Sequence, residues 1–363
     1  MRPTSCEIDL DAIEQNVRAL SALVSPTPLC AVVKANGYGH GAVPVAKRAL
    51  DAGVSWLAVA LVEEGVELRE AGIDAPILVL SEPHPSAMDT VVSNRLTASL
   101  YSLGGIAAIA EAAAAATEPV EVHVCIDTGM RRVGAEPGLL AEIVERIERY
   151  PQLSLTSVWT HCPVADEPDN PFTGDQLGVF SRAIDSLAHE VETHVGNSAV
   201  AITRPERAAM MVRCGIAMYG IDPDVALTGR VLLAPAMSVR SEVSFVKTVE
   251  AGEGIGYGHR YTTTDTTTIV TVPIGYADGV RRDLGLCGGE VLIGGQRHPI
   301  RGVVTMDQLM VDVGNAGVAV GDEVIVIGSQ GGEAITAADV ADLLGTIPYE
   351  VVCAVSSRMP RTY

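Results

Sequence analysis

Apolar and polar residues follow two different patterns along this chain, and the change comes near residue 225. Before it, short apolar runs alternate with longer stretches of helical period. An apolar run of four to eight residues is typical of a buried strand, and apolar residues at every third or fourth position are typical of a helix that covers it. The sequence thus predicts eight strands, at residues 29–33, 56–61, 76–80, 96–100, 120–126, 155–160, 192–195 and 210–214.

The stretches between these runs are amphipathic or alanine-rich and predict helices. They cover residues 10–23, 42–52, 62–71, 106–116, 139–150 and 177–189. Eight strand–helix repeats over roughly 200 residues favour a (β/α)8 TIM-type barrel. A doubly wound sheet stays open as an alternative, because periodicity does not show closure. No GxGxxG follows the first strand, which removes the main dinucleotide-binding alternative.

After residue 225 the chain becomes rich in Val, Thr, Ile and Gly, with short alternating runs separated by glycine turns. This texture predicts a smaller, mostly β domain. Thr336 and Gly345 bracket one helix, 337–344, as N-cap and C-terminal stop. We therefore expect an α/β barrel over residues 1–228 and a β-rich domain over 229–363, with the first ~8 residues able to pair with the β domain. Its strands are expected at 239–249, 266–272, 290–293, 303–313 and 323–327.

Composition narrows the class of protein. A net charge of −20 argues against nucleic acid or an anionic membrane surface as a partner. Seven cysteines without a CxxC spacing fit a reducing compartment and predict no structural metal. The N-terminus does not have the pattern of a signal peptide, and no run approaches the ~18 apolar residues of a membrane span. We expect a soluble, cytoplasmic protein.

One lysine stands out chemically. The first apolar run ends in AVVKANGYGHG, where Lys34 precedes a glycine-rich turn that carries Tyr38. The chain has only three lysines against 22 arginines. An amine can lose its proton and attack a carbonyl, whereas a guanidinium cannot at ordinary pH. The alternative, a lysine that merely extends to solvent at a strand end, is common, but the scarcity of lysine favours a reactive amine.

Other reactive side chains follow the later strands, where the catalytic face of such a barrel lies. They are Asp127 and Arg132 after the fifth run, His161 after the sixth, Asn197 and Ser198 after the seventh, and Arg213, Gly215 and Ile216 at the eighth. A serine and glycine amides after strands 7 and 8 suit a phosphate group. Taken singly, His161 could be a structural histidine, Arg213 an ion-pair partner and Ser198 a helix cap. Their shared position favours one site.

These segments, taken together, resemble the alanine racemase family of pyridoxal 5'-phosphate (PLP) enzymes. The resemblance rests on VVKANGYGHG, IDTGM, HCPVADEPDNPF, GNSA, RCGIAMYG, GIGYGHRY, IGYADG, TMDQ and SSRMPR, which run in order over nearly the whole chain. It implies a racemase of a small amino acid, most simply alanine, that acts as a homodimer with active sites shared between subunits.

The resemblance also implies the roles of individual residues. Lys34 would carry PLP and act as one base, and Tyr257 of the partner subunit would be the second base on the opposite face. The charges of Arg213 and His161 would favour a tyrosinate. The phosphate would be held by Tyr38, Ser198, Gly215 and Ile216, with Asn197 nearby. Arg213 would meet the pyridine nitrogen, and His161 would link Arg213 to Tyr257. Arg132 would contact cofactor and substrate, and Tyr276, Met306 and Asp307 would lie on the substrate side.

Two residues depart from the family pattern. Cys125 stands where a carbamylated lysine often supports the barrel arginine, so Arg132 needs another partner, either a bound chloride or a carboxylate. Ser357 stands where a tyrosine usually crowds the substrate pocket. That change makes a serine racemase or another small polar substrate an alternative, although neighbouring side chains could equally fill the space. A related PLP decarboxylase fits less well, because neither Cys287 nor Cys353 lies in a CDS-like motif. A non-catalytic PLP-binding protein would lack Tyr257.

Overall fold

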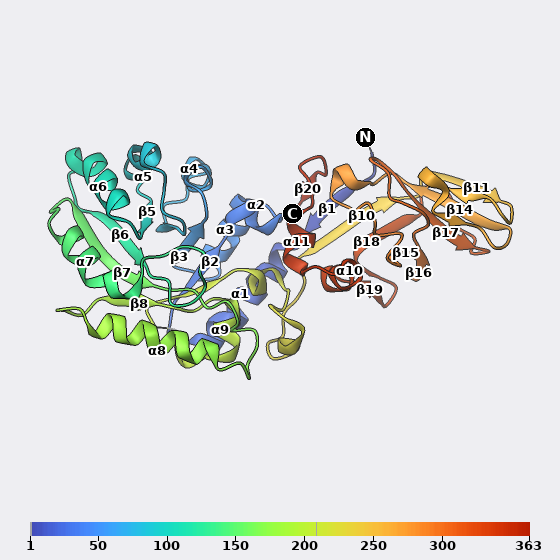
Figure 1. The fold of residues 1–363 in the computed structure, drawn as a ribbon. Coiled ribbons are helices and arrows are strands. Elements are labelled where there is room, and N and C mark those ends of the chain that lie inside the picture. The colour runs from blue at the N-terminus through green and yellow to red at the C-terminus, as the bar shows by residue number, and fades with distance from the viewer. Residues whose placement is uncertain (1, 208) are drawn as a thin grey trace. The chain divides into compact units, whose positions relative to one another are not determined.

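The structure is a computed structural model that describes residues 2–207 and 209–363 (Figure 1). The chain forms two compact units. One contains residues 11–37 and 42–234, and the other contains residues 1–10, 38–41 and 235–363. We call them the barrel unit and the β unit. The short segment Tyr38–Gly41 belongs to the β unit although the chain on both sides of it belongs to the barrel unit.

The barrel unit is built on eight strands, all hydrogen-bonded to parallel neighbours in the order β8-β7-β6-β5-β4-β3-β2-β9. The two ends of this order meet, because the N–H of Arg213 donates to the carbonyl of Gly196 at 3.0 Å and Asn197 forms a parallel bridge with Arg213. The predicted barrel class is confirmed. Its strands are β2 (Leu29–Val32), β3 (Trp56–Val59), β4 (Ile77–Val79), β5 (Thr97–Leu100), β6 (Val120–Cys125), β7 (Leu153–Trp159), β8 (Glu192–His194) and β9 (Val212–Cys214).

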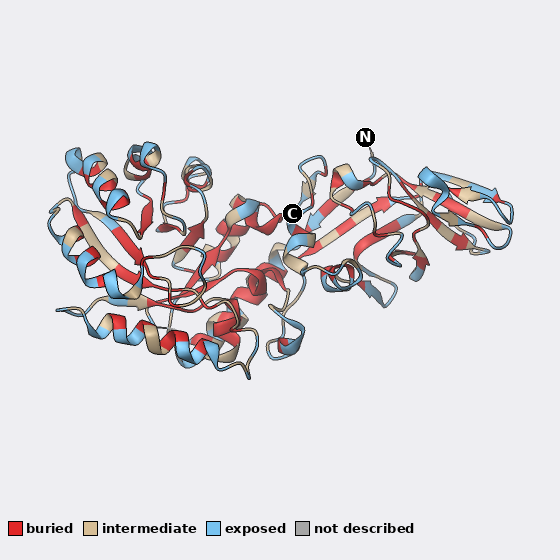
Figure 2. Ribbon diagram, viewed as in Figure 1, coloured by how far each residue is buried: buried red, intermediate tan, exposed pale blue. Residues whose placement is uncertain are grey.

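Helices cover the outside of this sheet, and their buried residues recur at helical spacing. In α1 (Leu10–Val24) the buried side chains include Ile13, Val17 and Leu20, which lie on one face. Figure 2 shows the strands mostly buried and the helices exposed on their outer sides. The other helices are α3 (Ala42–Asp51), α4 (Val62–Glu70), α5 (Met88–Ser93), α6 (Leu103–Ala112), α7 (Leu140–Glu148), α8 (Phe172–Asp185) and α9 (Ser198–Thr203).

Two of these helices begin earlier than the periodicity predicts. Helix α6 begins at Leu103 because the Ser102 hydroxyl caps it, accepting the N–H of Gly105 at 2.9 Å. Helix α8 begins at Phe172, five residues before the predicted 177, where Asn170 Oδ1 accepts the Phe172 N–H. It ends at Asp185 rather than 189. In both cases a local polar bond sets the start, which an apolar repeat does not reveal.

The β unit contains a seven-stranded sheet in the order β16-β15-β18-β10-β1-β20, with β19 beside β18. The N-terminal strand β1 (Ser5–Ile8) pairs antiparallel with β10 (Met237–Glu242) and parallel with β20 (Arg361–Thr362). A second sheet has the order β11-β14-β17, and β12 pairs with β13. The remaining strands are β11 (Phe245–Val249), β12 (Gly254–Ile255), β13 (Tyr261–Thr262), β14 (Thr267–Val272), β15 (Glu290–Ile293), β16 (Gln296–Pro299), β17 (Leu309–Gly314), β18 (Glu323–Gln330) and β19 (Glu333–Ile335).

Two predicted strands of this unit differ from the structure. The run 239–249 is divided between β10 and β11, which lie in different sheets. The run 303–313 is a strand only from Leu309, and the preceding residues form a loop. The predicted helix appears as α10 (Ala337–Leu344), with Thr336 as N-cap and a left-handed Gly345 at its end. It is followed by α11 (Pro348–Cys353). Over residues 2–207 and 209–363, no helix combines the length and apolar character that a membrane crossing requires.

Candidate active site

Lys34 lies two residues past the end of β2 and begins a short turn with left-handed backbone angles. The backbone φ is +53° at Ala35, +53° at Asn36, +61° at Gly37 and +52° at Tyr38. A left-handed conformation costs about 1–2 kcal/mol for each residue with a Cβ. Three of these four residues carry one, so the turn is strained unless its surroundings hold it.

Several bonds hold this turn in place. The Gly37 N–H donates to the Val33 carbonyl at 2.8 Å, and Asn36 Oδ1 accepts the N–H of Ala42 at 2.9 Å. A Cβ at Gly37 would lie 3.3 Å from the Ala42 backbone, which favours glycine there. The Tyr219 hydroxyl fixes the preceding strand by donating to the Val32 carbonyl at 2.9 Å. These bonds set the position from which the Lys34 side chain leaves the strand.

Arg213, on β9, is a buried cation inside the barrel. Its Nη1 lies 2.6 Å from Nδ1 of His194, and its Nη2 donates to the Thr160 carbonyl at 2.9 Å and lies 3.3 Å from Nδ1 of His161. The guanidinium also lies 4.7 Å from the ring centre of Trp159. A guanidinium can only donate, so both imidazole Nδ1 atoms must be acceptors.

This direction of donation determines which ring nitrogen carries the proton in His194 and in its neighbour His123. His194 accepts at Nδ1 and so carries its proton on Nε2, which lies 3.0 Å from Nδ1 of His123 on β6. Both imidazoles are fully buried. Burial and then the charge of Arg213 lower the pKa of His123 to about 3, and the same causes hold the pKa of His194 well below its usual range. The two imidazoles are therefore neutral and orient Arg213.

Burial of His161 favours its neutral form, in contrast to the charge expected from the sequence. Burial lowers its pKa to about 3, with further lowering by the charges of Arg213, Arg132 and Lys34. These influences also show that four residues expected at the site lie around one point of the barrel. With Nδ1 accepting from Arg213, the imidazole proton of His161 resides on Nε2 and can be donated to an oxygen.

The residues expected at the phosphate form a set of donors. Asn197 caps α9, with its Oδ1 accepting the Val200 N–H at 2.9 Å, and its amide donates to the Cys162 carbonyl. Ser198 Oγ accepts the Gly215 N–H at 2.9 Å, which leaves the hydroxyl hydrogen for another acceptor. Gly215 and Ile216 begin a 3₁₀ helix, Ile216–Tyr219, whose first N–H groups have no acceptor within the helix. Such a donor set fits a phosphate.

A small pocket beside Arg132 is lined by Cys125, Asp127, Thr160 and His161, among others. Burial raises the pKa of the Cys125 thiol to about 12, so it is neutral. Within residues 2–207 and 209–363, no carboxylate lies within ion-pair distance of Arg132. Asp127 instead binds the backbone of its own loop, accepting from the N–H groups of Gly129 and Arg131.

Tyr257, expected as the second base, lies in the β unit between β12 and β13. Its neighbours Gly256 and Gly258 both have positive φ, +68° and +70°. A Cβ at Gly256 would lie 2.8 Å from the side chain of Met310. Tyr257 is 73% exposed. The hairpin thus presents the phenol outward on a tightly turned loop.

The residues expected on the substrate side share one corner of the β unit. Tyr276 donates its N–H to the Thr305 carbonyl at 2.9 Å, next to Met306 and Asp307. Gly275 must be a glycine here, because a Cβ would lie 2.4 Å from the Met306 carbonyl oxygen. Asp307 pairs with Arg358 at 2.7 Å.

A buried carboxylate holds this corner together. Asp278 makes a two-pronged pair with Arg2 at 2.8 Å for both bonds and accepts the Gly275 N–H at 3.0 Å. Arg358 also approaches it, at 3.7 Å. The neighbouring Ser357 is exposed. The network fixes the backbone on which Tyr276 stands.

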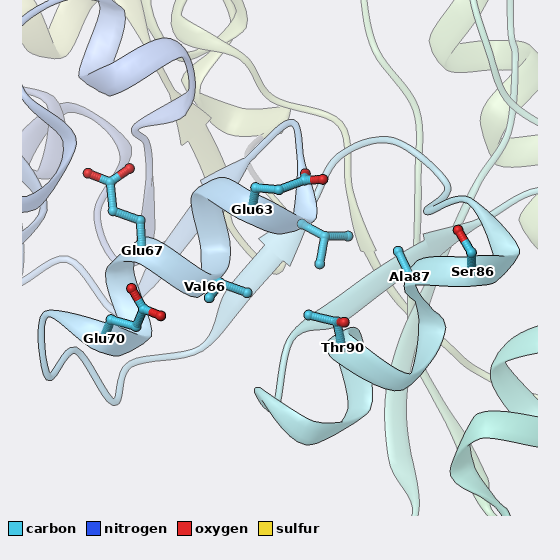
Figure 3. Close-up of a pocket in the computed structure, with 8 residues that line it drawn as sticks. Glu63, Val66, Glu67, Glu70, Ser86, Ala87 and Thr90 are labelled. Atoms are coloured by element: carbon cyan, nitrogen blue, oxygen red, sulfur yellow. The ribbon is translucent and has the colours of Figure 1, made fainter.

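A groove elsewhere in the barrel unit is chemically different. It is lined by α4 and α5 and carries Glu63, Glu67 and Glu70 (Figure 3). It lies among the outer helices and contains none of the expected site residues. Among the residues that the structure describes, no group of His, Cys, Asp or Glu side chains is arranged to hold a metal ion.

His123 and His194 were not predicted from the sequence as residues of the site. Both lie on strands and point into the barrel, where a histidine in an apolar run is usually a structural residue. The available signal was weak: in β6, His123 and Cys125 alternate with apolar residues and so share the inner face. Which histidine meets which arginine depends on strand order, which the sequence does not contain.

Comparison with known proteins agrees with this architecture. Residues 8–223 match the family model "Alanine racemase, N-terminal domain", and residues 236–363 match "Alanine racemase, C-terminal domain". An alanine racemase of Symbiobacterium thermophilum is 45% identical over 368 residues, covering 100% of this chain and 97% of that protein.

Solved structures also match this chain over nearly its full length. The alanine racemase from E. faecalis has a TM-score of 0.96 at 40% identity, covering 100% of this chain and 98% of that one. A histidine racemase from Leuconostoc mesenteroides has a TM-score of 0.92 at 29% identity, covering 100% and 98%. Both domains, in order and at full length, identify the chain as a member of the alanine racemase family of PLP-dependent amino-acid racemases.

Proposed function

We propose that this protein interconverts L- and D-alanine with PLP as cofactor, and that Lys34 and Tyr257 act as bases on opposite faces of the substrate. The observation that carries the proposal is the position of Lys34. It lies after β2 on a left-handed turn that hydrogen bonds hold in place. The same barrel contains Arg213, His161 and a set of hydrogen-bond donors that fits a phosphate. Racemisation needs a proton removed from one face and another delivered to the other, which two bases perform directly.

Lys34 and the donor set would hold the cofactor. Its amine would bind the aldehyde. The Ser198 hydroxyl and the Ile216 N–H would donate to the phosphate, with Gly215 holding Ser198 in place through its own N–H, and Arg213 would meet the ring nitrogen. Tyr38 and Asn197 would complete that cradle, with Arg132 on the substrate side. When bound, PLP makes the α-proton of an amino acid acidic by withdrawing electrons from the α-carbon.

His161 would help Tyr257 to release its proton and act as a base. A neutral imidazole with its hydrogen on Nε2 can donate to a phenolate oxygen, and Arg213 behind it keeps that hydrogen in place. This arrangement favours a tyrosinate through a hydrogen bond rather than through a charge on histidine. Backbone N–H groups at Met306 and Asp307 would donate to the substrate carboxylate, and Tyr276 would line its path.

The high exposure of Tyr257 supports a shared site, because a base that serves a second copy must be presented outward. We propose a head-to-tail homodimer in the cytoplasm, with a barrel domain over 1–228, of which the first ~8 residues pair with the β domain, and a β domain over 229–363. The direct test incubates purified protein and PLP with a panel of L-amino acids in deuterated water. D-alanine carrying α-deuterium is expected. A decarboxylated amine, or no change, would reject the proposal.

A second substrate is supported by two observations. Ser357 is exposed and small where the family usually has a tyrosine, and a close structural neighbour is named a histidine racemase. A racemase for serine or another small polar amino acid is therefore the second candidate. In the same panel, a higher kcat/KM for serine than for alanine would favour it, and Ser357→Tyr should then move the preference back to alanine.

We also propose that an anion, chloride in solution, lies beside Arg132. The neutral Cys125 thiol and the lack of a carboxylate partner in the described chain leave this cation uncompensated. Replacing chloride by gluconate should raise KM or lower kcat about tenfold, as expected for a lost charge-assisted bond. Cys125→Lys, with bicarbonate present, should remove the dependence. Equal activity in chloride-free buffer would contradict the proposal.

A further inference from the structure

Glu64, a residue outside the proposed catalytic set, contacts the strained turn that follows Lys34. One carboxylate oxygen, Oε1, accepts the Ala35 N–H at 2.6 Å. The other, Oε2, accepts the N–H groups of Ala60 and Leu61 at 2.8 and 3.0 Å. A single carboxylate thus joins the loop after β2 to the loop after β3, with three backbone donors on two oxygens.

The position of Glu64 explains why it is fixed. It is the third residue of α4, where a carboxylate normally reaches back to the first N–H groups of its own helix. Its bonds to Ala60 and Leu61 are of this kind. The bond to Ala35 is additional and lies 29 positions away in sequence. The helix therefore holds the carboxylate, and the carboxylate holds the turn.

We propose that Glu64 is a positioning residue for Lys34, keeping the left-handed turn Ala35–Gly39 in the one conformation that presents the lysine amine to the cofactor. Ala35 is the first left-handed residue and its N–H follows Lys34 directly, so the bond acts on the peptide next to the amine-bearing residue. Without it, this strained peptide can relax toward ordinary backbone angles. The proposal rests on the proposed role of Lys34.

Glu64→Asp separates the two functions of this carboxylate. In α10 of the same protein, Asp339 at the third position caps its own helix, accepting the Thr336 N–H at 2.8 Å. An aspartate at residue 64 can therefore still cap α4, but it is one methylene too short to reach Ala35. Glu63→Gln is the matched control, because Glu63 is in the same turn of α4 and faces the outer groove (Figure 3).

The first measurement is hydrogen exchange of the cofactor-free protein in the peptide covering residues 29–42. Glu64→Asp should raise the exchange rate at the turn about tenfold or more, the size of one lost bond to a charged acceptor. The melting temperature should stay close to that of the wild type. Glu63→Gln should change neither. Faster exchange throughout the chain, or unchanged exchange at the turn, would overturn the proposal.

The second measurement uses the holoenzyme. Glu64→Asp should weaken PLP binding about tenfold and lower kcat, with little change in KM for alanine. Borohydride reduction followed by peptide mapping should label Lys34 less completely than in the wild type. If the wild type does not label at Lys34, the proposed function fails. The exchange result still tests whether Glu64 holds the turn after Lys34. If Glu64→Asp labels and turns over like the wild type, only the positioning role fails.

Discussion

Arg213 is a buried cation that has no carboxylate partner in the part of the chain that the structure describes. Its acceptors are two neutral imidazoles and two backbone carbonyls, and its Cζ lies over the Trp159 ring. Burying a charge without an opposite charge costs free energy. A buried arginine of this kind therefore indicates a role for its hydrogen-bond donors. Here the surrounding groups orient the guanidinium without neutralising it, which leaves it able to act on a bound ring nitrogen.

Lys34 gives the sharpest prediction for a single residue. Lys34→Ala should abolish the visible absorbance of lysine-bound cofactor and lower kcat about 10²–10⁴-fold, the range for the loss of a catalytic base. Lys47→Ala is the control, since Lys47 is exposed on α3. Spectra and turnover of both purified variants check this. Normal absorbance in Lys34→Ala would place the cofactor on another amine.

The sequence could predict where these residues stand, but not which of them touch. Lys34, His161 and Arg213 follow or end apolar runs, and parallel strands bring such ends to one face. The bond from Glu64 to Ala35 and the pair His123–His194 join separate strand–helix units, so they depend on side-chain direction and reach. Nor could the alternating pattern of 239–249 show that the chain leaves one sheet for another after residue 242.

At the scale of the elements, β6 and β8 carry His123 and His194, and His161 follows β7. The pKa of His123 and of His161 is lowered to about 3, and that of His194 is held well below its usual range. The unfolded chain binds these protons near pH 6.5. Stability from the neutral imidazoles is therefore complete above about pH 6.5 and is lost as the pH falls toward 3.

This predicts acid unfolding that takes up protons at buried imidazoles. The free energy of unfolding should fall below pH 6.5 with a slope of up to about 1.4 kcal/mol per pH unit for each histidine. His123→Asn keeps an acceptor for His194 and should reduce this slope by about one proton. Urea unfolding between pH 7.5 and 5, with the exposed His189→Gln as control, measures it. An unchanged slope in His123→Asn would contradict the assignment.

At the scale of the whole molecule, the proposed sharing of sites can be tested by mixing two inactive variants. If each site takes Lys34 from one subunit and Tyr257 from the other, a heterodimer of Lys34→Ala and Tyr257→Ala contains one intact site and one site lacking both bases. Random reassembly makes half of the dimers heterodimers, so about a quarter of wild-type activity should return. Activity of refolded mixtures against each variant alone is the measurement. No recovery would mean that each subunit uses its own tyrosine.

The place of β1 in the sheet has a consequence for synthesis on the ribosome. β1 ends at Ile8, whereas its partner β10 begins at Met237 and its other partner β20 begins at Arg361. At a translation rate of about 5–20 residues per second, β1 has no partner strand for on the order of ten to fifty seconds after its synthesis. It is short, and its sequence SCEI includes a charged residue, features that discourage pairing with other nascent chains. Strand β20 then completes this edge of the sheet beside β1.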